Sequence, residues 1–150
     1  FKNFYFINLK SMDNNTTFTM IKPDAMENGH AGDILSIIIK SGFHISALRL
    51  VRLSKDQAKT FYKVHSAKPF FNELVEFITR SPIIVAVLKK NNAVADFRKL
   101  IGSTNPRDAE DGTIRRLFAT SMGENSIHGS DSIDNARVEC SFFFTGSEII

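Results

Sequence analysis

The longest unbroken apolar run in the sequence occupies residues 83–88, directly after Pro82, and consists mostly of isoleucine and valine. A short run of this kind is typical of a fully buried β-strand. It is far below the roughly 18 consecutive apolar residues that a membrane-spanning helix needs. The sequence therefore predicts a water-soluble chain, with no membrane partner, whose core includes a buried strand.

The size and composition of the chain fit one such core. Its 150 residues are 43% hydrophobic and include 14 phenylalanines, which suits one domain and is too apolar for a disordered chain. Residues 1–11 lack the small-residue pattern of a signal-peptide cleavage site, and Met12 follows them. We expect residues 1–11 to be an N-terminal extension outside the fold and residues 12–150 to form a single domain.

Apolar periodicity and turn residues divide the chain into elements. Strands are expected at 16–21, at 43–53 with a bulge, at 83–88 and, as a short strand or turn, within 125–131. Helices are expected at 31–41, 54–65 with a capping box, 70–79, 92–101 and 132–143, with a turn at 22–24 and a loop at 103–112. This order predicts an α/β (α+β) sandwich of the ferredoxin-like split βαβ type. Its sheet is expected to be four-stranded and mostly antiparallel, with helices on one face.

Charge and cysteine content narrow the class of ligand. The 19 basic and 16 acidic residues give a net charge of +3, too small an excess to indicate a nucleic-acid surface, whereas anionic small molecules remain open. Cys140 is the only cysteine, so an intrachain disulfide and a cysteine-rich zinc site are excluded. It fits a reducing compartment and a role as a small apolar filler.

The strongest chemical signal is His128, within the segment NSIHGSDS at 125–132. A histidine beside a turn is more often structural than catalytic, but its neighbours favour chemistry here. Gly129 allows close approach by a bulky anion, and Ser132 opens a helix whose free N–H groups attract phosphate oxygens. Glu139, further along that helix, can hydrogen-bond one imidazole nitrogen and leave the other free as a nucleophile.

This segment resembles the signature of the nucleoside diphosphate kinases, enzymes that move a terminal phosphoryl group between nucleotides. Further motifs agree in the family's order: TMIKPD at 19–24, Tyr62 followed by PFF at 69–71, Arg98 through GSTNP at 102–106, and GTIR at 112–115. The similarity extends over residues 16–144, nearly the whole expected domain. It implies a ping-pong reaction through a phosphohistidine at His128.

The resemblance also implies a role for each of the other matching residues. They are the phosphate-facing cations Lys22, Arg98 and Arg115, the hydroxyl donor Thr104, the sugar-binding Asn125, the base-stacking Phe70, Tyr62 packed near the histidine and lysine, and Glu139. Within this set, His128, Lys22, Tyr62 and Glu139 are the expected catalytic residues. Because every base offers a flat ring for stacking, broad tolerance of the base is expected.

Simpler interpretations stay open for several of these residues. Lys22 at a strand end is usually a solvated charge, and Arg98 on a helix face is usually an ordinary surface residue. Of the adjacent rings Phe70 and Phe71, only one is expected to be exposed as a stacking platform. Asp131 is expected to cap the last helix rather than to act as an acid.

The implied cofactor is Mg²⁺, and the implied ligands are ATP and other nucleoside tri- and diphosphates. The metal is expected to be held through nucleotide phosphates and water, so no protein ligand is named. No Walker-type G-x-x-x-x-G-K-[ST] loop and no kinase-type G-x-G-x-x-G loop occurs in the sequence. The loop around Pro106 and the three cations are therefore expected to bind the phosphates.

Ile37 and Ile39 make the outer face of the first long helix unusually apolar. Members of the family form dimers assembled into tetramers or hexamers, so one interpretation is burial between subunits; the other is a central core helix. A cytoplasmic homo-oligomer that requires no nucleic acid is expected. The alternative functions are a catalytically silent, nucleotide-binding regulatory member of the family and a ferredoxin-like nucleic-acid module.

Overall fold

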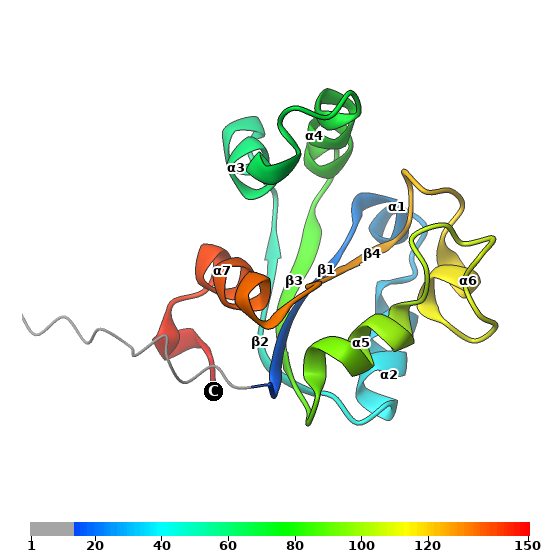
Figure 1. The fold of residues 1–150 in the computed structure, drawn as a ribbon, viewed down its shortest axis with the longest axis vertical. Helices are drawn as coiled ribbons and strands as arrows, with labels where there is room; N and C mark the ends of the chain where they lie inside the picture. Colours follow the sequence, from blue (N-terminus) through cyan, green and yellow to red (C-terminus); the bar gives the residue numbers. More distant parts are fainter. Residues whose placement is uncertain (1–13) are drawn as a thin grey trace, which may run out of the picture.

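The computed structural model describes residues 14–150, so the expected extension at 1–11 lies outside the described residues. The strands are β1 (Thr16–Ile21), β2 (His44–Val51), β3 (Ile83–Lys89) and β4 (Ile127–Gly129). The helices are α1 (Pro23–Glu27), α2 (Ala31–Lys40), α3 (Lys55–Phe61), α4 (Phe71–Thr79), α5 (Ala93–Ile101), α6 (Ile114–Phe118) and α7 (Ile133–Phe143), with 3₁₀ turns η2 (Lys63–His65) and η3 (Gly146–Glu148). Figure 1 shows their arrangement.

The four strands form one sheet in the order β2-β3-β1-β4, and each neighbouring pair is antiparallel. β1 and β2 therefore run parallel to each other with β3 between them, and α1 and α2 connect them. This confirms the predicted ferredoxin-like split βαβ arrangement. The predicted bulge in the second strand is present, because the register with β3 shifts between Ile45 and Ala47.

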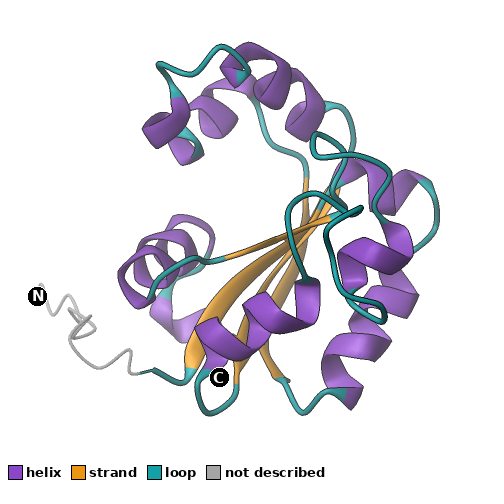
Figure 2. Cartoon of the chain, turned by 45° about the vertical axis from the view of Figure 1, so that its right-hand side comes forward, coloured by secondary structure: helices purple, strands orange, loops and turns teal. Residues whose placement is uncertain are grey.

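Helices cover both faces of the sheet, not one face as expected (Figures 1 and 2). Phe18 and Val87 belong to a core cluster formed with α3, α4 and α7. Ala86 and Leu88 point to the opposite face, into a second cluster formed with α2 and α5. The uninterrupted apolar run at 83–88 is the signal for this arrangement, because a strand buried on one face only would alternate apolar and polar residues.

Two helix ends differ from expectation at positions that matter for the site. The predicted capping box is present, with Ser54 Oγ accepting from the Gln57 N–H at 3.1 Å and Gln57 Oε1 accepting from the Ser54 N–H at 2.9 Å. The helix that it opens ends at Phe61, however, so that Tyr62 is its C-cap. Residues 22–24, expected as a turn, begin α1, with Lys22 as N-cap and a proline in the first turn.

Helix α6 was not predicted, since its five residues are too few to show a helical period. Among residues 14–150, no helix is long and apolar enough to cross a membrane.

Candidate active site

His128 lies on the short strand β4, where it pairs with Met20 of the central strand β1. Its ring packs near two phenylalanine rings, those of Phe18 and Phe61, with each pair of ring centroids 5.9 Å apart. The side chain keeps 23% of its surface exposed. The packing fixes the plane of the imidazole while one edge stays accessible to a ligand.

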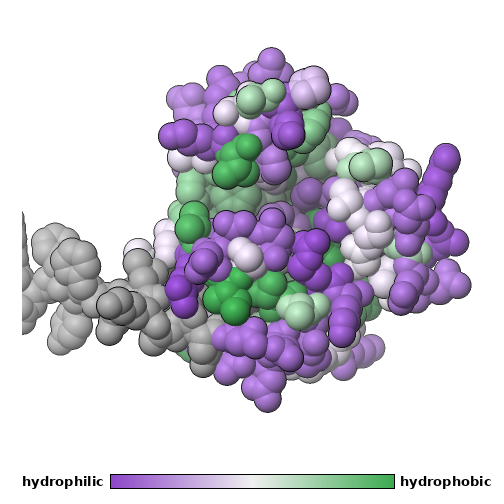
Figure 3. Space-filling model, in the orientation of Figure 1, coloured by the Kyte–Doolittle hydropathy of each residue, from purple (hydrophilic) through white to green (hydrophobic). Residues whose placement is uncertain are grey.

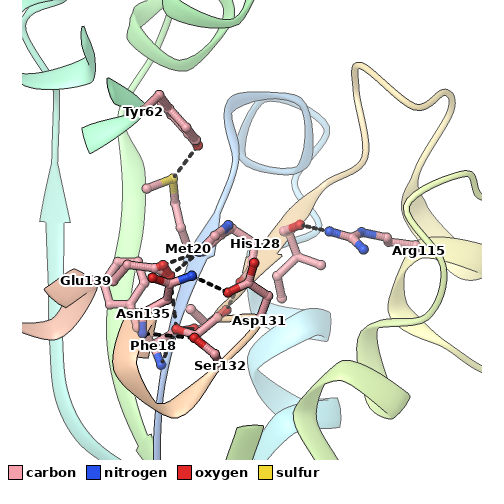
Figure 4. A network of polar contacts seen from close by, with 12 residues as sticks. Phe18, Met20, Tyr62, Arg115, His128, Asp131, Ser132, Asn135 and Glu139 are labelled. Atoms are coloured by element: carbon pink, nitrogen blue, oxygen red, sulfur yellow. Dashed lines mark hydrogen bonds and ion pairs between the residues drawn. The ribbon is translucent and has the colours of Figure 1, made fainter. Parts of the chain in front are cut away.

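A carboxylate holds one nitrogen of this ring (Figure 4). His128 Nε2 lies 2.6 Å from Oε1 and 3.0 Å from Oε2 of Glu139, as expected from the sequence. With a carboxylate at Nε2, the proton of a neutral imidazole is placed there, and the lone pair is left on Nδ1. Within residues 14–150, no hydrogen bond to Nδ1 is formed, so this atom is available as a nucleophile.

Ser130 is a site residue that the sequence analysis did not identify. Its hydroxyl donates to Glu139 Oε1 at 3.0 Å and accepts from the Phe18 backbone N–H at 3.3 Å. The side chain is fully buried. Ser130 therefore fixes the carboxylate that fixes His128. The available signal was the spacing, because residues two apart along an extended segment face the same side.

Lys22 is buried, only 7% exposed, and is not the solvated charge that a strand end usually carries. Its ammonium group donates to Asn125 Oδ1 at 2.8 Å, and Asn125 Nδ2 in turn donates to the Met122 carbonyl oxygen at 2.9 Å. Burial, together with the nearby Arg115, lowers the pKa of Lys22 from 10.5 to about 7, while Asp24 acts in the opposite direction. A buried cation of this kind favours an anionic ligand.

Arg115, on α6, is the second buried cation, with 8% of its surface exposed. Its guanidinium donates to the carbonyl oxygens of Gly102 at 3.0 Å and of Ile127 at 2.8 Å (Figure 4). Ile127 directly precedes His128, so Arg115 is held at the backbone beside the histidine. Its Nε is buried without a hydrogen-bond partner among the described residues. Burial, followed by repulsion from Arg98, lowers the pKa of Arg115 to about 10.

Tyr62 lies beside Met20 of β1. Its hydroxyl is 3.9 Å from Met20 Sδ, and burial raises its pKa, with a smaller contribution from Glu139. Within residues 14–150, the hydrogen-bond partner of the Tyr62 hydroxyl is thus Met20, the residue paired with His128. A tyrosine with a raised pKa stays protonated, so it can donate a hydrogen bond.

The remaining expected residues lie at the surface. Phe70 is 48% exposed, whereas the adjacent Phe71 packs against the core, so only one of the two rings is exposed, as expected. Arg98 and Thr104 are exposed, and Arg98 reaches the site electrostatically through Arg115. The surface is hollowed between the α3–α4 hairpin and the rest of the molecule (Figure 3).

The segment after His128 differs in one respect from expectation. A Cβ atom on Gly129 would lie 2.9 Å from Phe97 and 3.0 Å from Ile101, so the glycine is required by the side chains of α5, and approach of an anion to it stays a prediction. The cap of α7 is Ser132, which accepts from the Asn135 N–H at 3.0 Å, while Asp131 accepts from the Asn135 side chain instead. Both residues support the backbone around His128.

Comparison with known proteins gives the family to which this chain is similar. The family model described as nucleoside diphosphate kinase matches residues 15–149. A nucleoside diphosphate kinase of Flavobacterium psychrophilum is 55% identical over 137 residues, covering 91% of this chain and 99% of the relative. One from Phenylobacterium zucineum is 51% identical over 134 residues, covering 89% and 96%.

Solved structures of nucleoside diphosphate kinases also resemble this chain. The nucleoside diphosphate kinase of Aquifex aeolicus superposes with a TM-score of 0.88 at 42% identity, covering 91% of this chain and 99% of that one. The Halobacterium salinarum enzyme, solved in complex with CDP, has a TM-score of 0.87 at 35% identity and 92% coverage of both chains. The chain therefore belongs to the nucleoside diphosphate kinase family.

Proposed function

We propose that this chain transfers the terminal phosphoryl group of a nucleoside triphosphate to a nucleoside diphosphate through a phosphohistidine at His128. The lone pair of Nδ1 attacks the γ-phosphorus, the bond from phosphorus to the β-phosphate oxygen breaks, and the nucleoside diphosphate leaves. A terminal oxygen of a second diphosphate then attacks the phosphohistidine and restores the imidazole. The observation that carries this proposal is the pairing of Nε2 with Glu139, which leaves Nδ1 without a hydrogen-bond partner among residues 14–150.

The buried cations support binding of the phosphates. Burial destabilises the charged forms of Lys22 and Arg115, as their lowered pKa values show. An anionic phosphate bound close to both would stabilise those charged forms. Both side chains are held by hydrogen bonds before the ligand arrives, which is the preorganisation that stabilises charge developing in phosphoryl transfer. Arg98, at the surface beside Arg115, is the third proposed phosphate-binding cation.

The nucleoside is proposed to lie along the hollow toward the α3–α4 hairpin. The base is proposed to stack on the exposed ring of Phe70, and the sugar to hydrogen-bond to the amide of Asn125. Thr104 is the proposed hydroxyl donor to the nucleotide. Stacking on Phe70 requires no hydrogen bond to a base edge, so a broad range of nucleoside tri- and diphosphates is proposed as substrates. The bound CDP of the Halobacterium relative is consistent with this class of ligand.

Mg²⁺ is proposed as the cofactor, carried by the nucleotide. Residues 14–150 contain no group of three or more His, Cys, Asp or Glu side chains suited to hold a metal ion. Mg²⁺ dehydrates reluctantly and is commonly held by substrate phosphates and water, so the proposal requires no such group. When bound, the ion neutralises phosphate charge during transfer. The buried, free thiol of Cys140 is compatible with the cytoplasm as the proposed location.

The proposed assembly is a homo-oligomer. Ile39 on α2 and Leu50 on the edge strand β2 are 54% and 62% exposed, so apolar surface remains uncovered at that side of the sheet. A catalytically silent regulatory function is disfavoured, because the family's reactive histidine, its carboxylate partner and its cations are all present.

Labelling with γ-³²P-ATP tests the proposed reaction. The protein is expected to acquire a label that is lost in acid and kept in base, and a nucleoside diphosphate is expected to remove it. His128→Ala should take up no label, whereas His44→Ala, which removes an exposed histidine on β2, should label normally. An unlabelled wild-type protein would overturn the proposal.

A further inference from the structure

Asp24 is a buried carboxylate beside the candidate active site that the proposed mechanism does not use. It follows Lys22 and Pro23 in α1 and is only 4% exposed. One oxygen, Oδ2, accepts a hydrogen bond from Ser126 Oγ at 3.1 Å. The other, Oδ1, is buried without a hydrogen-bond partner among the described residues. An unsatisfied buried carboxylate oxygen is costly, so its presence calls for an explanation.

The partner of Asp24 is itself unusual. Ser126 is fully buried and has a φ of +69°, a left-handed conformation that is strained for a residue with a side chain. Its carbonyl oxygen accepts from the Lys22 backbone N–H at 2.9 Å. Ser126 also directly follows Asn125, whose side chain binds the Lys22 ammonium group. Asp24 and Lys22 are therefore both tied to the same short segment before β4.

The charges around Lys22 are unbalanced without Asp24. Arg115 approaches from α6 and disfavours the charged form of Lys22, and Arg98 on α5 adds to the positive charge at Arg115. Asn125 is neutral, and on β4 the imidazole of His128 is paired with Glu139 of α7. The carboxylate of Asp24 is the group that favours the charged form of Lys22.

We propose that Asp24 is a positioning residue for Lys22: its negative charge keeps Lys22 protonated before nucleotide binds, and Ser126 holds the carboxylate in place. This inference rests on the proposed function, in which the Lys22 ammonium group contacts phosphate oxygens. It explains the buried position of Asp24, because a carboxylate exposed to water would be screened from Lys22.

Asp24→Asn removes the negative charge of the side chain but keeps its shape and an oxygen that can accept the hydrogen bond from Ser126. The pKa of Lys22 should fall further, since an opposite charge has been lost, so the ammonium fraction at neutral and alkaline pH decreases. In single-turnover phosphorylation of His128 by ATP, kcat/KM of the variant should lie near wild type at about pH 6 and several-fold lower at about pH 8. A merely structural defect would lower kcat/KM by the same factor at every pH, and that result would overturn the proposal.

A second measurement needs no activity. The Lys22 side-chain ¹⁵N resonance, assigned with Lys22→Arg, is titrated without nucleotide in wild type and Asp24→Asn, and its midpoint should move down by roughly half a pH unit or more. Asp33→Asn makes the same change in net charge on the exposed surface of α2 and should leave the midpoint in place.

The milder variant Ser126→Ala keeps the charge of Asp24 but frees the carboxylate, and it should move the Lys22 midpoint downward by less. No movement in Asp24→Asn and Ser126→Ala would overturn the inference. A wild-type protein that shows the expected midpoints but takes up no phosphoryl group from ATP would overturn the proposed function instead.

Discussion

At the scale of single residues, the site is built from charges that the fold tolerates at a cost. Burial lowers the pKa of Lys22 to about 7 even though Asn125 accepts a hydrogen bond from its ammonium group. Arg115 is likewise destabilised by burial and keeps one buried N–H without a protein acceptor among the described residues. Such groups reduce folding stability and are retained where a ligand supplies the missing charge.

The lowered pKa of the buried Lys22 predicts how the free energy of unfolding depends on pH. Between a folded pKa of about 7 and an unfolded value of 10.5, the unfolded chain binds a proton that the folded chain does not. The contribution of Lys22 to the free energy of unfolding therefore rises with pH across this window and is most unfavourable below it. Lys22→Met should thus be most stable, relative to wild type, at about pH 7 and below.

We expect this advantage of Lys22→Met to shrink by roughly 2 kcal/mol between about pH 7 and about pH 9. Urea unfolding of both proteins across this range measures it. A difference that stays constant with pH would show that Lys22 is not titrating in this window. The same variant should lose phosphorylation of His128, so that stability and activity change in opposite directions at neutral pH.

How much of the site could be predicted depends on what each residue does. Lys22, Asn125, His128 and Glu139 were identified by a motif, and the structure brings them together in two hydrogen-bonded pairs. Ser130 and Asp24 act through other residues, and serines and aspartates in such positions are common in turns and caps. For Ser130, the two-residue spacing from His128 was the available signal. For Asp24, nothing in the local sequence distinguishes a buried support from an exposed turn residue, and only the tertiary contacts do.

At the scale of elements, one arginine connects three segments around the site. Arg80, at the C-terminus of α4, forms a two-armed ion pair with Glu27 of α1, with Nε–Oε1 and Nη2–Oε2 distances of 2.9 Å. Its Nη2 is also 2.9 Å from Oε1 of Glu124, the residue before Asn125. The guanidinium additionally stacks 5.1 Å from the Phe77 ring. The α3–α4 hairpin is thereby tied to both segments that position Lys22.

Arg80→Met should lower the free energy of unfolding by about 1 kcal/mol at low salt, because it removes both ion pairs and keeps the apolar stem. Lys55→Met, which removes the single exposed ion pair to Glu76 between α3 and α4, is the matched control and should cost less. High salt should reduce the loss for Arg80→Met, since the pairs are partly exposed. A loss no larger than that of the control would exclude a special role for Arg80.

The order and type of the longer elements were predictable because each carries a strong local signal. The capping box at Ser54 and the glycine after α2 marked helix ends correctly. The number of covered sheet faces was mispredicted, although the apolar run of β3 carried that information. Helix α6 could not be predicted, because five residues held by Arg115 contacts to Gly102 and Ile127 depend on the tertiary structure.

At the scale of the whole molecule, β2 and β4 are the two edge strands of the described sheet. β4 is short and is followed closely by α7, whereas β2 is the longer edge strand, and its Ser46 carbonyl oxygen accepts a hydrogen bond from the Ile150 N–H at 3.0 Å. Leu48 and Leu50 lie on the sheet face that α2 covers, yet they are 45% and 62% exposed, and Ile39 of α2 is exposed as well. An exposed apolar edge strand is a template for pairing with another chain. This supports association through β2 and α2.

A further apolar patch lies over α7, where green side chains appear among hydrophilic ones (Figure 3). Val138, on this helix, is 68% exposed. Unlike β2, α7 has no unpaired backbone groups along its middle to offer a partner, because its own hydrogen bonds satisfy them. Association through β2 and association through α7 can therefore be distinguished by placing a single lysine on each surface.

Size-exclusion chromatography with light scattering should give a mass of at least two chains for the wild-type protein at micromolar concentration. Leu50→Lys should reduce that mass to one chain, because a charged side chain on the edge strand opposes both pairing and burial. Val138→Lys introduces the same charge on α7 and should leave the assembly intact. A monomeric wild-type protein would contradict association altogether, and dissociation by Val138→Lys but not Leu50→Lys would move the interface from β2 to α7.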